Sequence, residues 1–221
     1  MPNLIFNPVS KDTFSDLATF FEQHGNPNYC WCMRWRIKST EFQKAKSKER
    51  RSKLQSFVQN NIPIGVMAYH QDKVVGWCSI APRETYSLLE GSTTLKRIDD
   101  LPVWSVVCFF VDPNLRRQSL PIKLLQAATK YAFSQGATIV EGYPVEPDKS
   151  YGLGHRFGQP VLIGLNQHGL GWRRWSLLGR SAGQIEMGQQ IVKQVERLCI
   201  EEPLGRGRTI GSCDEIVMHG C

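Results

Sequence analysis

The sequence predicts an α/β fold, in which a sheet is flanked by helices, over about residues 1–150. The first indication is VWSVVCFFV (103–111), a run of apolar, mostly β-branched or aromatic residues that is typical of a strand covered on both faces. The second is the segment after it, where apolar residues recur at helical spacing from Leu120 to Tyr131. A strand predicted at 138–140 completes a strand, helix and strand unit.

Several elements are predicted before this unit. Residues 4–9 form a predicted strand, 11–24 an amphipathic helix and 39–60 a second, very basic helix. Residues 64–70 and 74–80 follow as a predicted β-hairpin. The predicted order is therefore a strand, two helices, a hairpin, and then the strand, helix and strand unit.

The turn between the 103–111 strand and its helix is predicted to bind an anion. Arg116 and Arg117 precede Ser119, which is a good N-cap residue. Pro121 follows in the first turn of the helix, where proline is tolerated. The N-terminus of a helix offers unpaired N–H groups and a positive dipole end, which suit a phosphate. The alternative is an ordinary βαβ crossover whose turn happens to be basic.

Four phrases, taken in order along the chain, resemble the GNAT superfamily of acetyl-CoA-dependent N-acetyltransferases. They are YCWCMRWR (29–36), VVGWCSIAPRE (74–84), VWSVVCFFV (103–111) and EGYPVEP (141–147). The resemblance runs from Leu4 to about Pro147. It implies a GNAT-like mixed, twisted central sheet flanked by helices.

The resemblance also implies a site for acetyl-CoA as co-substrate. In the superfamily, an Arg/Gln-x-x-Gly-x-Gly/Ala turn holds the pyrophosphate of coenzyme A, and the preceding strand pairs with the pantetheine arm. The matching turn has Ser119 in place of a glycine that lets the backbone approach phosphate, and Pro121, which has no N–H to donate. The implied cofactor-binding residues are Phe109, Phe110, Val111, Arg116, Arg117, Gln118, Ser119 and Leu120.

Direct acetyl transfer to an amine needs a base, a polarised thioester carbonyl and a proton for the leaving thiolate. Backbone N–H groups at the edge of the 106–111 strand would polarise the carbonyl, as the resemblance implies. Many superfamily members carry a glutamate base on this strand, but this chain has none there. Glu84 and Glu141 are therefore the candidate bases, and Tyr143 is the candidate acid. The structural alternatives are that Glu84 caps a turn or pairs with Arg83, and that Tyr143 packs at the rim.

The YCWCMRWR phrase is predicted to pack beneath an acceptor cleft. The candidate substrate-binding residues are Trp31, Arg34 and Trp77. The two cysteines of the phrase could begin a zinc site, but no second ligand pair with similar spacing follows, so no metal is expected. A cysteine nucleophile is disfavoured, because the spacing gives no Cys-His-Asn/Asp arrangement.

Composition and charge limit the possible partners. The chain has no apolar run long enough for a membrane span and no signal-like N-terminus, so a cytoplasmic location without a membrane partner is expected. An odd total of seven cysteines favours free thiols. The net charge is +7, and much of it lies in residues 38–53. The simplest interpretation is a solvated helix face, followed by attraction of coenzyme A or an acidic substrate. Nucleic acid is an unlikely partner, since no stacking aromatics are interleaved with the lysines.

Residues 151–221 differ in composition from the rest of the chain. They hold 13 of the 19 glycines, while lysine falls from eleven to one and arginine only from eight to seven. No final strand that would close the sheet is predicted after Tyr151. This Gly/Arg-rich segment is interpreted as a divergent extension, a second small module or, preferably, a stretch read in a shifted frame, and the sequence does not predict whether it is ordered.

The predicted activity is transfer of an acetyl group from acetyl-CoA to an unknown amine of a small molecule or peptide, by direct transfer. A second hypothesis is a degenerate, non-catalytic protein that binds acyl-CoA. A third is a basic nucleic-acid-binding protein that keeps the fold. A homodimer is compatible with each of them.

Overall fold

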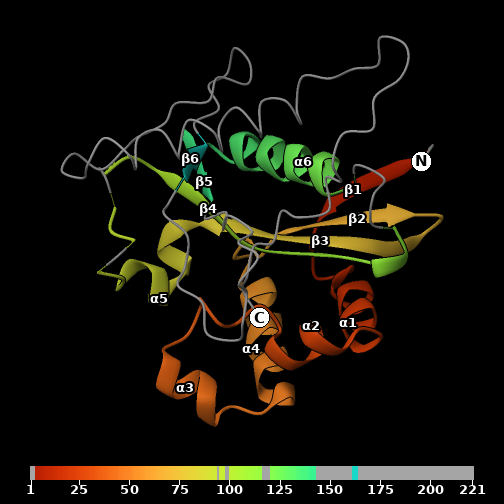
Figure 1. Cartoon of the computed structure of the whole chain (residues 1–221), viewed down its shortest axis with the longest axis horizontal. Coiled ribbons are helices and arrows are strands. Elements are labelled where there is room, and N and C mark those ends of the chain that lie inside the picture. Colours follow the sequence, from red (N-terminus) through yellow and green to blue (C-terminus); the bar gives the residue numbers. More distant parts are fainter. Residues whose placement is uncertain (1–2, 94, 98–99, 116–119, 143–160, 164–221) are drawn as a thin grey trace, which may run out of the picture.

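The computed structural model of the chain describes residues 3–93, 95–97, 100–115, 120–142 and 161–163. The strands are β1 (Leu4–Pro8), β2 (Val66–His70), β3 (Lys73–Pro82), β4 (Val103–Val111), β5 (Ile139–Gly142) and β6 (Val161–Ile163). The helices are α1 (Phe14–Glu22), α2 (Gly25–Cys30), α3 (Ser39–Lys44), α4 (Ser47–Gln59), α5 (Ser87–Glu90) and α6 (Leu120–Ser134) (Figure 1). Two short 3₁₀ turns are η1 (Arg83–Thr85) and η2 (Pro113–Leu115).

The strands form one mixed sheet in the order β1-β2-β3-β4-β5-β6. Neighbouring strands from β1 to β4 are antiparallel, β4 and β5 are parallel, and β5 and β6 are antiparallel. Helices lie on both faces of this sheet (Figure 1). The predicted α/β fold with a mixed, helix-flanked sheet is therefore confirmed.

The two faces of the sheet bury different residues. Helix α6 covers one face, whereas α1, α2, α4 and α5 lie on the other (Figure 1). Along β2, Val66 and Ala68 belong to the core under α6, and Met67 between them belongs to the core under the other helices. This alternation is the period of two of a strand buried on both sides. It explains why the strands in the middle of the sheet are apolar almost throughout.

The predicted hairpin is present, and its turn has two central residues. Gln71 (φ 49°) and Asp72 (φ 62°) both have positive φ, as a tight hairpin turn of the type I′ class requires. Gly65, just before β2, has a φ of 154°, and a Cβ there would lie 2.2 Å from the carbonyl oxygen of Cys78. Only glycine fits this close approach of the chain to β3.

The long basic helix predicted at 39–60 is wrong, because the chain forms two helices there. Ala45 is extended, with φ −69° and ψ 132°, and separates α3 from α4. Helix α4 starts anew, since the Glu49 carboxylate accepts a hydrogen bond from the backbone N–H of Lys46 at 2.9 Å. That contact satisfies one of the unpaired donors at a helix start.

The basic residues of α4 are largely engaged within the protein. Arg50 is buried and donates to the carbonyl oxygens of Tyr29 and Phe42, at 2.7 and 2.6 Å. Two further cations form ion pairs, Arg51 with Glu22 at 2.9 Å and Lys53 with Glu41 at 2.5 Å. These contacts favour the structural interpretation of the basic segment over a nucleic-acid surface.

The expectation that no strand follows Tyr151 is wrong for residues 161–163. These residues form β6, which pairs antiparallel with β5 through Val140 and Ile163. Three consecutive β-forming residues, Val-Leu-Ile, satisfy the edge of β5 that would otherwise be open. The rest of the 151–221 segment lies outside the described residues, so its interpretation stays a prediction.

Candidate active site

Strands β4 and β5, the fourth and fifth of the six strands, are the parallel pair of the sheet. Their described pairing runs from Val103 with Ile139 to Val106 with Gly142. Strand β4 continues to Val111, while the chain that follows Gly142 lies outside the described residues. A strand edge whose backbone N–H and C=O groups have no strand partner can pair with an extended ligand.

A β-bulge directly follows the last described pair of β4 and β5. The register between β3 and β4 passes from Ser79 with Cys108 to Ile80 with Val106, which leaves Val107 as the extra residue. A bulge reorients the backbone locally and is common beside active sites. Amide groups turned in this way can donate to a carbonyl oxygen that gains negative charge in a transition state.

The predicted cofactor residues fall into two groups. Phe109 packs on the α6 side of β4 and Phe110 on the α1 side, both half-buried, and Val111 is buried. Leu120 starts α6 with a fully buried side chain, so it could contact a cofactor only through its backbone. The turn 116–119, with Arg116, Arg117, Gln118 and Ser119, lies outside the described residues, and cofactor binding by all eight residues stays a prediction.

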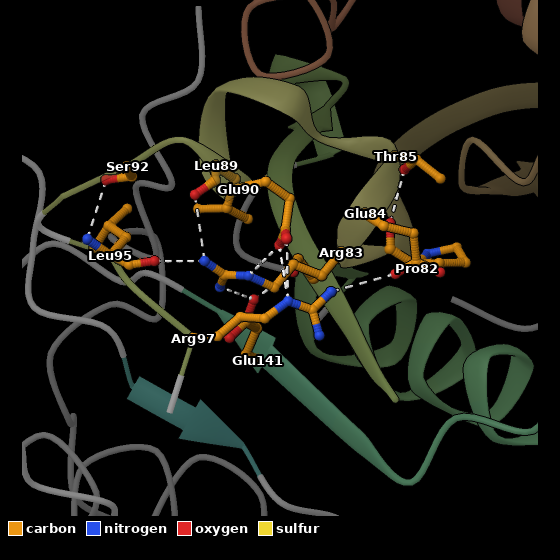
Figure 2. Close-up of polar contacts among 11 residues, drawn as sticks. Pro82, Arg83, Glu84, Thr85, Leu89, Glu90, Ser92, Leu95, Arg97 and Glu141 are labelled. Carbon is orange, nitrogen blue, oxygen red and sulfur yellow. Dashed lines mark hydrogen bonds and ion pairs between the residues drawn. The ribbon is translucent and has the colours of Figure 1, made fainter. Parts of the chain in front are cut away.

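The candidate base Glu141 lies in a buried ionic cluster. Its Oε1 accepts a hydrogen bond from Nη1 of Arg83 at 2.6 Å (Figure 2). The hydroxyl of Ser105 donates to the same oxygen. Arg83 is 1% exposed, and its Nε also donates to Glu90 at 2.7 Å. Because Glu141 is directly opposite Ser105 in the register, this cluster holds β4 to β5 one residue before their last described pair. These contacts indicate that the Glu141 carboxylate stabilises the fold. The role of Glu141 as a base stays a prediction.

The candidate base Glu84 is on the surface. Its side chain is 67% exposed, and its carboxylate lies 3.6 Å from Nη2 of Arg97 (Figure 2). The expected alternative pairing with Arg83 is wrong, because Arg83 faces Glu90 and Glu141 instead. Tyr143, the candidate acid, lies outside the described residues.

Most of the YCWCMRWR phrase is buried in the core beneath the sheet, and the acceptor cleft expected above it stays a prediction. Trp31 is buried and its Nε1 donates to the hydroxyl of Ser47 at 2.9 Å. Trp77 is also buried, and its Nε1 donates to Sγ of Cys32 at 3.1 Å. Neither indole presents a surface to solvent, because both fill the core beneath the sheet. Arg34 is half-buried with its guanidinium 5.5 Å from the Phe42 ring, and it is the predicted substrate residue that keeps access to solvent.

Three buried cysteines, Cys32, Cys78 and Cys108, are free thiols, as expected, whereas Cys30 is disulfide-bonded and departs from that expectation. The hydrogen bond from the Cys108 thiol lowers the pKa of Cys32 and raises that of Cys108 itself. Burial raises the pKa of Cys78. Among the residues that the structure describes, no group of three or more His, Cys, Asp or Glu could hold a metal ion. In the same residues, no helix is long and apolar enough to cross a membrane.

His24, which the sequence did not single out, lies beside the part of β4 that extends beyond its described pairing with β5. It follows α1, and its ring centroid is 5.2 Å from that of Phe110 and 4.8 Å from that of Phe20. Its Nδ1 lies 2.7 Å from the carbonyl oxygen of Phe20. The signal in the sequence is a histidine four residues after a buried phenylalanine at a helix end, a position that also suits a simple capping role.

Comparison with known proteins assigns the chain to a protein family. Residues 28–150 match the family model described as the Acetyltransferase (GNAT) family. This match, on a mixed sheet with a parallel β4–β5 pair, defines an N-acetyltransferase that uses acetyl-CoA as co-substrate. Because the match covers more than half of the chain, the protein belongs to the GNAT acetyltransferase family. No curated protein matches the chain.

Several solved structures are similar to the chain at low identity. A polyamine N-acetyltransferase of Drosophila melanogaster is 17% identical, with 66% of this chain and 78% of that chain covered and a TM-score of 0.46. The aminoglycoside N-acetyltransferase AAC(6')-Iy in complex with CoA is 11% identical, with 96% and 99% covered and a TM-score of 0.46. The loading GNAT domain of CurA from Lyngbya majuscula is 16% identical, with 69% and 71% covered and a TM-score of 0.41. The family assignment rests on the match over residues 28–150 rather than on these likenesses.

Proposed function

We propose that the protein transfers an acetyl group from acetyl-CoA directly to an amine of a small molecule or peptide. The observation that carries this proposal is the bulge at Val107 of β4, which directly follows the last described pair of β4 with the parallel strand β5. We expect the edge of β4 at residues 107–111 to bind the cofactor. An extended pantetheine arm fits such an edge, because its amides can pair with the backbone as another strand would. The thioester would then lie at the bulge.

The reaction at this position would proceed in a ternary complex. The amine loses a proton to a base, and its nitrogen attacks the thioester carbonyl carbon. Backbone N–H groups near Val107 stabilise the oxygen as it becomes negative. The C–S bond then breaks, coenzyme A leaves as the thiolate, and Tyr143 is the proposed donor of the proton that neutralises it.

The cofactor phosphates would bind at the start of α6. Arg116 and Arg117 supply positive charge, and the helix N-terminus supplies N–H donors. The buried side chain of Leu120 fixes the first turn of this helix to the sheet, which supports a defined position for the phosphate-binding backbone.

Two sequence features, the altered turn and the lack of a glutamate on β4, favour the second hypothesis, a protein that binds acyl-CoA without turnover. Ser119 and Pro121 stand where the family's turn has small residues with free N–H groups, and β4 carries no glutamate. A weakened cofactor turn and a missing base would both reduce catalysis. The cytoplasmic location and a homodimer are proposed on the sequence alone.

Calorimetric titration with acetyl-CoA, followed by an assay of thiol release, tests the proposal. The amines to be offered are a polyamine, agmatine, an aminoglycoside and a lysine-containing peptide. Heat of binding and thiol release with at least one amine are expected. Binding without release from any amine favours the non-catalytic protein, and no binding at near-millimolar acetyl-CoA contradicts both coenzyme A hypotheses.

A further inference from the structure

The side chain of His24 is held in one orientation. Its Nδ1 lies 2.7 Å from the carbonyl oxygen of Phe20, and a carbonyl can only accept a hydrogen bond, so Nδ1 carries the hydrogen. In the neutral ring the lone pair is then on Nε2. Among the described residues, none forms a hydrogen bond with Nε2. The tautomer required of a proton acceptor is therefore already selected.

The ring also lies against the part of β4 that extends beyond its described pairing with β5. Its centroid is 5.2 Å from that of Phe110, which belongs to the 107–111 stretch and faces the α1 side of the sheet. Phe20 packs on the same Phe110 ring at 5.4 Å, so both aromatic rings fix the position of His24 relative to β4. Helix α1 lies next to the end of β4 in Figure 1. The side chain is half-buried and thus reaches solvent.

We propose that His24 is the general base that takes the proton from the acceptor amine. This inference rests on the proposed function and names a residue outside the 28–150 family match. The N–H bond of the ammonium breaks as an Nε2–H bond forms, directly or through one water. The neutral amine then attacks the thioester carbonyl, and the coenzyme A thiolate leaves and takes up a proton.

The other candidate bases are less well placed. Glu141 is buried, and its Oε1 is occupied by Arg83 and Ser105. Glu84 is exposed and pairs with Arg97. By contrast, His24 combines a fixed tautomer, a lone pair without a partner in the described residues and contact with the 107–111 stretch of β4.

Titratable groups on the neighbouring elements must be considered when the pH dependence is interpreted. They are Asp16 and Glu22 on α1, Tyr29 on α2, and Cys108 on β4. Asp16 accepts from the hydroxyl of Tyr69 at 2.9 Å, and Glu22 pairs with Arg51 at 2.9 Å. The two carboxylates are thus engaged with groups other than the imidazole.

His24→Gln tests the proposal, with His70→Gln on β2 as the matched control. The variants are compared with the wild type in the affinity for acetyl-CoA, in kcat and in the pH–rate profile, using the amine that the wild type acetylates fastest. We expect kcat to fall about 100-fold or more in His24→Gln, with unchanged affinity for acetyl-CoA. The rise in rate between about pH 5 and 8, the range in which histidine ordinarily titrates, should disappear. His70→Gln should keep both rate and profile.

A second variant distinguishes the loss of a catalytic group from a loss of activity through misfolding. In His24→Ala, added imidazole should restore part of the rate, and it should not accelerate the wild type. Unchanged kcat and profile in His24→Gln, or loss of the same pH limb in Glu84→Gln instead, would overturn the role of His24. A slow His24→Ala that imidazole does not rescue also overturns it. An inactive wild type overturns the proposed function itself, which is a separate result.

Discussion

Arg83 and Glu141 form a buried ion pair, with 2.6 Å between Nη1 and Oε1, one residue before the last described pair of β4 and β5. Arg83 comes from η1 at the end of β3, and Glu141 comes from β5 (Figure 2). Ser105 of β4 also donates to the carboxylate. Residues from η1, β4 and β5 thus meet at one carboxylate, next to the stretch of β4 that the proposed function uses.

Arg83→Met should lower the free energy of unfolding by about 3–5 kcal/mol, because it removes the guanidinium that pairs with the buried Glu141 carboxylate. Urea unfolding measures this change. Lys53→Met is the control, since its ion pair with Glu41 lies at the surface and is worth no more than about 1 kcal/mol. The double variant Arg83→Met with Glu141→Leu should be more stable than the single one. Equal stability of Arg83→Met and Lys53→Met would contradict a structural role for the buried pair.

Gly65→Ala should destabilise the protein by about 1–3 kcal/mol, because the new Cβ would lie 2.2 Å from the Cys78 carbonyl oxygen and 2.5 Å from the Trp77 ring. Gly91→Ala is the matched control, since its Cβ would meet its nearest neighbour at an ordinary 3.5 Å. Thermal and urea unfolding of both variants give the comparison. A Gly65→Ala protein as stable as Gly91→Ala would mean that the chain before β2 relaxes without strain.

The sequence predicted local elements better than the contacts between them. The bounds of β4 follow directly from a run of residues that is apolar except for Ser105, and the start of α6 follows from Leu120 after the turn. The ion pair of Arg83 with Glu141 joins residues 58 positions apart, and it depends on strand order and register that no local pattern contains. The contact of His24 with Phe110 likewise exists only because α1 packs on β4. The sequence therefore predicts the strand that carries the site, whereas the side chains around that strand can be identified only in the folded structure.

Tyr86→Phe should make the free energy of unfolding fall less steeply with rising pH in the alkaline range. Burial raises the pKa of Tyr86 to about 12 in the folded protein, against about 10 for an exposed tyrosine. The folded state holds this proton more tightly, so the stabilisation is fully present below about pH 10 and is lost as the pH rises to about 12. Two pKa units correspond to about 3 kcal/mol.

Urea unfolding at about pH 8, 10 and 11 distinguishes the Tyr86 proteins. Other groups titrate in both proteins, so the difference between wild type and Tyr86→Phe isolates this residue. Tyr29→Phe, at a residue that is 61% exposed, should follow the wild type. A Tyr86→Phe protein that loses stability as steeply as the wild type would show that Tyr86 does not titrate in this range.

Ser119→Gly should tighten binding of acetyl-CoA, by up to about tenfold or about 1.4 kcal/mol. The serine stands where the family's turn has a glycine that lets the backbone approach the pyrophosphate, and removal of its Cβ restores that approach. Ser134→Gly, at the opposite end of α6, should leave the affinity unchanged and controls for a general effect on the helix. Calorimetry gives both dissociation constants. Unchanged or weaker binding in Ser119→Gly would show that the turn has already adapted to the serine, with the phosphates held by Arg116, Arg117 and the remaining N–H groups of the helix start.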